Sequence, residues 1–365
     1  MIDIKFDITI DARMINHSGI GTYIKNMIPN LIGNYSLALL GNTKILQSFE
    51  WSDKISIFSA DYPIYSITEQ INLPRVIPKC KIFISPHYNI PLRKILAEKR
   101  VVIIHDVNHL TKLNEISIVK KMYARYMLNA ALIKSDKVIT DSNFSKSEIK
   151  KYLSVKEKEI KVVYCSIDGD SIKKISDKID INVFREKYKL PKDYFLYVGS
   201  IKPHKNLILS LKAFKILREE YSKYKLVLIG VKPDEFYKNE ELNGLRDNVI
   251  VPGYISDNEL PAIYREALCL IFPSIYEGFG LPPLEAMSCE CPVITSNAAS
   301  LPEVCGDAAI YFNPFDVDEI VGAMKQIIED GNLVVSLKKK GLENIKRFSW
   351  SNFSSNLKKE FDELL

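Results

Sequence analysis

The 365-residue sequence contains no run that approaches the ~20 consecutive apolar residues of a membrane-spanning helix. Residues 1–10 lack the charged start, long apolar stretch and small-residue cleavage site of a secretion signal. Both absences favour a cytoplasmic protein. With 47% hydrophobic residues, the chain is long enough for two cores rather than one.

Metal and redox motifs are also missing. The six cysteines form no CxxC pair, and no His/Cys cluster has the spacing of zinc ligands. Because most cysteines lie in or beside apolar runs, we expect buried, reduced thiols. Two DxD sequences begin at Asp168 and Asp316, one in a linker and one at the start of a late helix. Neither position favours a metal site, so we expect none.

The net charge of +5 is too mild to indicate a nucleic-acid-binding protein. The charge is unevenly distributed, since residues 1–170 hold 24 Lys and Arg against 17 Asp and Glu, and the remainder holds 26 against 28. In the basic half, a predicted helix over 116–133 carries Lys120, Lys121 and Arg125 beside large apolar side chains. It is either an ordinary amphipathic helix that covers a sheet or one that docks on anionic lipid, and both interpretations stay open.

Short apolar runs alternate with helical patterns along the whole chain, for example at 6–10, 81–85, 101–105 and 137–140. Continuous apolar strands of this kind suit a parallel sheet covered on both faces. The alternation predicts an α/β fold built from doubly wound, Rossmann-like domains. In such sheets ligands bind beyond the carboxyl ends of the strands, so residues that follow strands are the candidates for a site.

A polar, lysine-rich stretch over about 168–192 contains the predicted hinge. We therefore divide the chain into an N-terminal domain at 1–170, a C-terminal domain at 171–347 and a final helix at 348–365. We expect this last helix to pack back on the N-terminal domain.

The most informative stretch is PSIYEGFGLPPLEAM at 273–287, which follows a predicted strand. Its glycines allow a tight turn, and its paired prolines suit the first turn of a helix. A free helix start with exposed N–H groups is an anion site, and a sugar diphosphate would fit it. Glu277 on the loop and Glu285, expected in the first helical turn, can both accept hydrogen bonds from sugar hydroxyls.

A second stretch, YVGSIKPHKNL at 197–207, follows the first strand of the second half and opens a helix. Lys205 is a point charge near that helix start, which is a suitable place for a phosphate.

Together the two stretches resemble the C-terminal half of glycosyltransferase family 4, retaining enzymes with the GT-B fold, in which two Rossmann-like domains face each other across a cleft. The E-x7-E pattern within EGFGLPPLEAM is the most specific part. In the first half, DAR at 11–13, SGIGTY at 18–23 and His105 resemble the family's first strand, its Gly-rich loop and its His-bearing strand end. The resemblance spans most of the chain and leaves 43–79 uninformative.

The resemblance implies roles for individual residues. Glu285 would bind the ribose and Glu277 the transferred sugar, Lys205 would neutralise the departing diphosphate, and His105 would contact the sugar and its developing charge. The remaining expected donor contacts are Gly19, Gly21, Ser200, Tyr254, Ile255, Phe279, Gly280 and Leu281. Arg13 and His17 are expected on the acceptor side. Many family members carry Arg where this chain has Ser200 and His204, so neutralisation rests more on Lys205.

The implied reaction transfers a hexose from a nucleotide diphosphate sugar to a glycan or lipid-linked glycan acceptor of a surface polysaccharide. GDP-mannose is the favoured donor, with UDP-hexoses close behind, and no cofactor besides the donor substrate is expected. Peripheral contact with the inner face of a membrane would suit such an acceptor, and no nucleic-acid partner is expected. Two alternatives stay open: a sugar-nucleotide epimerase of the same architecture, and a non-catalytic sugar-nucleotide-binding subunit.

Overall fold

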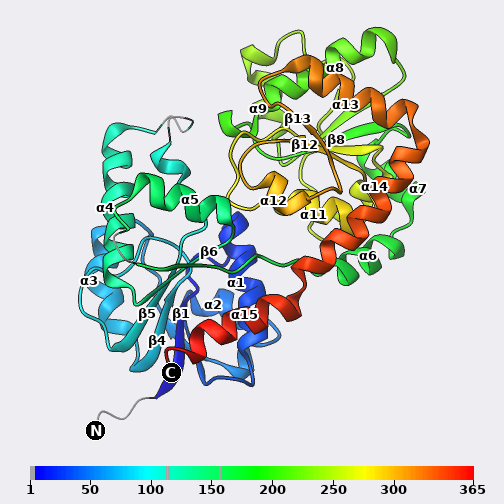
Figure 1. Cartoon of the computed structure of the whole chain (residues 1–365). Coiled ribbons are helices and arrows are strands. Elements are labelled where there is room, and N and C mark those ends of the chain that lie inside the picture. Colours follow the sequence, from blue (N-terminus) through cyan, green and yellow to red (C-terminus); the bar gives the residue numbers. More distant parts are fainter. Residues whose placement is uncertain (1–4, 112, 114–115, 156–157) are drawn as a thin grey trace. The chain divides into compact units, whose positions relative to one another are not determined.

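The computed structural model describes residues 5–111, 113, 116–155 and 158–365. The chain divides into two compact units (Figure 1). The first comprises Met1–Cys165 with Trp350–Leu365, and the second comprises Ser166–Ser349. The chain therefore passes from the first unit to the second between residues 165 and 166, whereas the sequence-based boundary lay between 170 and 171. The final helix belongs to the first unit.

The first unit is built on a parallel sheet of seven strands in the order β3-β2-β1-β4-β5-β6-β7. The strands are β1 (Phe6–Asp11), β2 (Leu37–Gly41), β3 (Ser56–Ser59), β4 (Cys80–Ser85), β5 (Ala97–Ile103), β6 (Lys137–Thr140) and β7 (Ile160–Val162). The helices are α1 (Ser18–Leu31), α2 (Thr43–Gln47), α3 (Ile67–Val76), α4 (Ile118–Lys134), α5 (Asn143–Tyr152) and α15 (Trp350–Asp362).

The second unit repeats the plan with six parallel strands in the order β10-β9-β8-β11-β12-β13. The strands are β8 (Tyr194–Val198), β9 (Lys225–Ile229), β10 (Val249–Ile250), β11 (Cys269–Phe272), β12 (Val293–Ser296) and β13 (Ile310–Phe312). The helices are α6 (Gly169–Lys178), α7 (Ile181–Tyr188), α8 (Leu207–Glu220), α9 (Pro233–Lys238), α10 (Leu260–Glu266), α11 (Leu281–Ser288), α12 (Leu301–Cys305), α13 (Val317–Glu329) and α14 (Gly331–Asn344).

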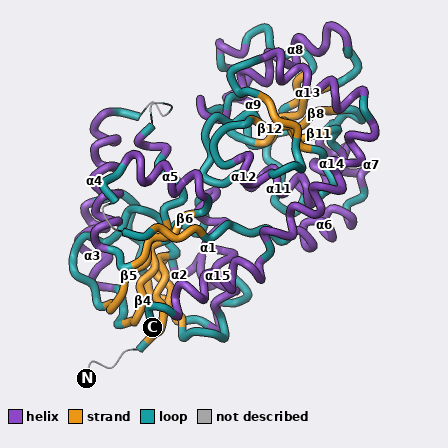
Figure 2. Tube along the Cα trace, viewed as in Figure 1, coloured by secondary structure: helices purple, strands orange, loops and turns teal. Residues whose placement is uncertain are grey.

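In each unit helices cover the sheet (Figure 2), so the central strands are buried and apolar throughout. This confirms the α/β, doubly wound prediction. The strand order reverses between β1 and β4 in the first sheet and between β8 and β11 in the second. These reversals are the topological switch points at which open α/β sheets bind ligands.

The lysine-rich stretch at 168–192 is not a hinge, and that prediction was wrong. It forms α6 and α7 within the second unit, and α6 packs against α10 and α11. The side chain of Asp168 caps α6 by accepting from the Ser171 N–H, and Phe184 of α7 is buried. A few apolar side chains on one face are enough to dock a helix whose other face is rich in lysine.

The helix α15 lies in the first unit, where Phe353, Leu357 and Phe361 are buried. The ring of Phe353 packs edge-on against Tyr23 of α1, and Lys137 of β6 forms ion pairs with Glu360 of α15 and with Glu363, which follows that helix.

All six cysteines are free and buried, as expected from their apolar surroundings. Among the described residues, no helix is both long and apolar enough to cross a membrane.

Candidate active site

The two informative stretches of the second unit meet at its switch point. Because β8 and β11 are parallel neighbours, with Leu196 opposite Leu270, the segments that follow them leave the sheet side by side. A backbone hydrogen bond of 2.8 Å from the Ile275 N–H to the His204 carbonyl joins the two segments directly.

Lys205 and Glu277 form the central ion pair of this region. The ammonium of Lys205 lies 2.6 Å from Oε1 of Glu277, and the two side chains are 22% and 13% exposed. Lys205 ends a short 3-10 turn, Pro203–Lys205, and Asn206 with φ of 55° redirects the chain into α8. A cation and a carboxylate are therefore held together at the carboxyl ends of two strands, half-buried and still accessible to a ligand.

The loop between β11 and α11 is fixed by the hydroxyls of two serines, one at the end of β12 and one after it. Ser300 donates to the carbonyls of Glu277 at 3.0 Å and Phe279 at 2.7 Å, and Ser296 donates to the Ser274 carbonyl at 2.5 Å. These bonds fix the conformation of the loop, and a loop fixed in this way would lose little entropy on binding a ligand.

Gly280 is required where α11 begins. Its φ is +102°, and a Cβ there would lie 2.9 Å from Cδ2 of Leu301. Leu281 is the first helical residue, so Pro282 and Pro283 occupy the first turn as predicted. Glu285 then lies in the second turn, not the first, which corrects the sequence-based placement.

Glu285 is held by Tyr264 of α10, whose hydroxyl donates to Oε2 at 2.9 Å. Burial raises the pKa of the Glu285 carboxyl, and the hydrogen bond from Tyr264 only partly opposes that shift. A desolvated carboxylate of this kind is stabilised when additional donors reach it. The hydroxyls of a ribose would supply such donors.

The other residues expected to contact the donor substrate differ in their exposure and in their hydrogen bonds. Tyr254 is 87% exposed, whereas Ile255 is buried. The Ser200 carbonyl accepts from the Tyr197 hydroxyl at 3.1 Å. The Phe279 ring is buried against Phe348, so only its backbone could meet a ligand.

His105 follows β5 in the first unit, and both of its ring nitrogens have partners. Nδ1 lies 2.5 Å from Oδ2 of Asp141, and Nε2 lies 3.0 Å from the Pro86 carbonyl. Burial lowers the pKa of His105, but the charge and hydrogen bond of Asp141 outweigh it, and the net pKa is raised. The imidazolium, which donates through both nitrogens, is the form that this environment favours.

The predicted Gly-rich loop at 18–23 is the first part of α1 and not a loop. A Cβ on Gly21 would lie 2.4 Å from the Ile15 carbonyl oxygen, so the close approach of two backbone segments requires this glycine. A Cβ on Gly19 would meet nothing within 4 Å. His17 is the exposed residue that precedes the helix.

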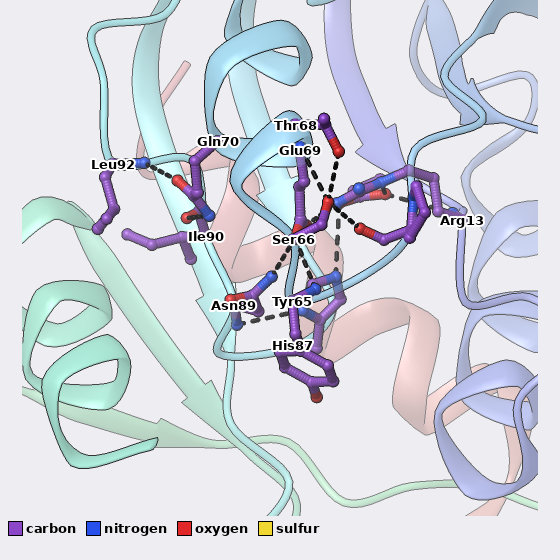
Figure 3. A network of polar contacts seen from close by, with 12 residues as sticks. Arg13, Tyr65, Ser66, Thr68, Glu69, Gln70, His87, Asn89, Ile90 and Leu92 are labelled. Carbon is purple, nitrogen blue, oxygen red and sulfur yellow. Dashed lines mark hydrogen bonds and ion pairs between the residues drawn. The ribbon is translucent and has the colours of Figure 1, made fainter. Parts of the chain in front are cut away.

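Arg13 lies inside a buried network at the other switch point (Figure 3). Its Nη2 contacts Asp11 and Glu69, each at 2.6 Å, and its side chain is only 3% exposed. The carboxylate of Asp11 also faces His87 at 3.4 Å. Burial raises the pKa of Asp11, but Arg13 and His87 more than reverse this, and the net pKa is lowered. The expected acceptor contact of Arg13 stays a prediction.

Glu69 was missed because it lies in the uninformative region 43–79. A readable signal was present, since Ser66-x-x-Glu69 has the spacing of a capping box. Ser66 is the N-cap of α3, and its hydroxyl accepts from the Glu69 N–H at 3.1 Å.

Neither DxD sequence takes part in a cluster of ligands. Asp168 caps α6 and Asp316 caps α13. Among the described residues, no three His, Cys, Asp or Glu side chains are grouped so that they could hold a metal ion.

Comparison with known proteins identifies the family. The profile described as "Glycosyl transferases group 1" matches residues 179–344. "O-antigen chain mannosyltransferase B" of Escherichia coli is 33% identical over 276 residues, which cover 74% of this chain and 71% of that protein. "O-antigen chain mannosyltransferase RfbU" of Salmonella typhimurium is 31% identical over 250 residues, which cover 68% and 65%.

Solved structures agree in fold. Sucrose-phosphate synthase of Thermosynechococcus elongatus superposes with a TM-score of 0.79 at 16% identity over 99% of both chains. Anabaena HepE, solved in complex with UDP-glucose, gives 0.76 at 13% identity over 98% of this chain and 100% of that one. The family resemblance of the sequence is thereby confirmed: the chain belongs to the group 1 glycosyl transferases, has the GT-B fold and is a mannosyltransferase-like hexosyltransferase.

Proposed function

We propose that this enzyme transfers mannose from GDP-mannose to a glycan or lipid-linked glycan during the synthesis of a surface polysaccharide, with retention of anomeric configuration. The observation that carries the proposal is the ion pair of Lys205 and Glu277 on a rigid loop at the switch point. The relatives that are mannosyltransferases by name support the choice of sugar.

The ion pair suits a sugar diphosphate because Lys205 can donate hydrogen bonds to the diphosphate and Glu277 can accept them from the sugar. The Lys205 ammonium has three donors, and Glu277 uses one of them. When a donor substrate binds, its diphosphate would take the free donors of Lys205, and the sugar hydroxyls would share the carboxylate of Glu277. Both Lys205 and Glu277 would thus gain hydrogen bonds to the ligand, and neither charge would be left unpaired.

In the proposed reaction the bond from the anomeric carbon to the diphosphate oxygen breaks, and a bond to the acceptor oxygen forms on the same face of the sugar. The acceptor proton passes to the departing diphosphate. Lys205 and the N–H groups at the start of α11 would stabilise the charge that develops on that diphosphate. We propose that these groups suffice without a metal ion. The family resemblance assigns His105 to the transferred sugar, and its partners Asp141 and Pro86 suit a role as a positive charge.

A donor panel with nucleotide release as the readout tests the function. We expect GDP release from GDP-mannose to be stimulated by an octyl α-mannoside acceptor, with a new disaccharide product. A changed donor sugar without a new glycoside would instead identify an epimerase. Release of UDP from UDP-hexoses at a higher kcat/KM than GDP from GDP-mannose would overturn the choice of donor.

We also propose that α4 places the enzyme on an anionic membrane surface. Its outward face is apolar and exposed, and consists of Ile118, Val119, Met122, Tyr126 and Ile133. Its inward face packs on the sheet through Ala124, Met127, Leu128, Ala131 and Leu132. The helix carries four cations and no acidic residue, so it combines the features of an interfacial helix.

Flotation with vesicles tests the role of α4. We expect the enzyme to float with vesicles that contain phosphatidylglycerol, and Met122→Ser with Tyr126→Ser to abolish this. Tyr237 of α9 is an exposed tyrosine of the other unit, so Tyr237→Ser is the matched control. Flotation that survives the double substitution would contradict the proposal.

A further inference from the structure

Four aromatic side chains form a continuous cluster at the carboxyl end of the first sheet. The rings of Tyr123 and Tyr65 lie 6.2 Å apart, those of Tyr65 and Tyr88 lie 6.1 Å apart, and those of Tyr88 and His109 lie 5.7 Å apart. We call these residues the tyrosine cluster. Tyr65 is 47% exposed and Tyr123 is 37% exposed, so the cluster offers ring surface to solvent.

The backbone of Tyr65 has φ of 65°, a left-handed conformation that is unfavourable for a bulky residue. It is held there by its own N–H, which donates to Oε2 of Glu69 at 2.8 Å (Figure 3). Backbone strain of this kind persists where surrounding structure enforces it, and it is commonly found at binding sites. The hydrogen bond to Glu69 therefore enforces the unusual backbone conformation that places the Tyr65 ring on this surface.

The carboxylate of Glu69 is also linked to Tyr123. Asn89 donates to Oε2 of Glu69 at 2.7 Å, and its own Oδ1 accepts from the Tyr123 hydroxyl at 2.7 Å. Glu69 and Asn89 are fully buried, and Arg13 neutralises Glu69 from the other side. One buried carboxylate thus fixes two half-exposed tyrosines that come from different elements.

Buried charges and strain are costly features in a fold, and here they hold rings in place at an edge where α/β sheets bind ligands. Tyrosine presents a rigid, amphipathic surface with little conformational entropy to lose. The negative face of an aromatic ring attracts the weakly positive C–H groups of a pyranose.

From this arrangement we infer that the tyrosine cluster binds a pyranose ring of the acceptor glycan. Tyr65 and Tyr123 contact the sugar, and Glu69, Asn89 and Arg13 are positioning residues that act through them. The choice of mannose as the sugar rests on the proposed function. The existence of the site does not, since it follows from the cluster and the network beneath it.

Calorimetric titration of the full chain with mannotriose, without donor, tests the site. Tyr65→Asn removes the ring while keeping a residue that tolerates the left-handed backbone, so folding is preserved. We expect it to weaken mannotriose binding about tenfold, and Tyr65→Phe, which keeps the ring, to bind like wild type within about twofold. Tyr237→Asn, which removes an exposed ring from the other unit, is the control and leaves binding unchanged.

A second measurement shows whether Glu69 positions the tyrosines for the acceptor or only stabilises the fold. Glu69→Gln should raise the acceptor KM while leaving the donor KM unchanged, whereas a merely structural role would move both or lower kcat alone. Thermal unfolding of the same variant shows whether the unit remains folded.

The inference is overturned if wild type does not bind mannotriose, or if Tyr65→Asn binds it as wild type does. Loss of vesicle binding in Tyr65→Asn with mannotriose binding intact would assign the cluster to lipid instead. Mannotriose binding without any donor turnover would refute the proposed function and leave this site standing.

Discussion

Replacing Glu277 by Gln should tighten the binding of free GDP while slowing transfer. The Glu277 carboxylate is paired with Lys205, so it would compete with a diphosphate for that ammonium. Gln preserves the shape of the side chain and removes only its charge. The transferred sugar, in contrast, would lose a charged hydrogen-bond acceptor, so kcat should fall.

The size of the effect follows from the geometry. Since Nζ of Lys205 lies 2.6 Å from Oε1 of Glu277, a phosphate oxygen bound to the same ammonium at ~2.8 Å lies at most ~5.4 Å from that carboxylate oxygen. Two unit charges at this separation repel by about 1.5 kcal/mol through an effective dielectric constant of ~40, between those of protein surface and water. The Kd of GDP should therefore fall roughly tenfold.

Calorimetric titration with GDP measures this, and Glu220→Gln is the matched control. Glu220 pairs with Lys325 at the same 2.6 Å in the same unit, but on its surface. The control should leave the Kd of GDP unchanged, and added salt should shrink the effect of Glu277→Gln. If Glu277→Gln instead weakened GDP binding, the carboxylate would serve to hold Lys205 in place, and the reasoning about competition would be refuted.

Three further outcomes are expected. Lys205→Ala should lower the kcat/KM for the donor by about 2–4 kcal/mol of transition-state stabilisation, measured by nucleotide release, and full activity would contradict its assignment to the diphosphate. Tyr264→Phe, which removes the donor to Glu285, should raise the donor KM more than it lowers kcat, as donor kinetics would show. NMR titration of His105 should give a pKa above the ordinary value of about 6.5. The stability that it gains from Asp141 should be complete below that value and lost as pH rises through the folded pKa, which denaturant unfolding across pH would show.

The meeting of the two stretches that follow β8 and β11 could be predicted from the sequence because of a simple rule of parallel sheets. Strand ends share one edge, so residues that follow neighbouring strands meet there. The placement of Lys205 and Glu277 near each other follows from that rule. Their direct pairing does not, because it depends on the register of β8 against β11 and on the turn at Asn206.

The network beneath the tyrosine cluster could not be predicted in the same way. The capping spacing of Ser66 and Glu69 indicates a helix start, but it does not say where the carboxylate goes. Its partner Arg13 follows β1, and its partner Asn89 follows β4, so the network depends on those strands being neighbours. The error over the hinge at 168–192 has a related cause, since lysine content conceals a buried face that only packing reveals.

The two proposed sites, one for a diphosphate and one for a pyranose, differ in where their charged side chains lie. A diphosphate is charged, and in the proposed donor site Lys205 is partly exposed beside a carboxylate that a diphosphate could displace. A pyranose is neutral, so exposed charge would gain little from it. In the first unit Arg13 and Glu69 are accordingly buried, and aromatic rings occupy the surface above them. On these proposals, the charge of Lys205 would contact the diphosphate directly, whereas the buried charges of the first unit would act on the pyranose only by positioning the rings above them.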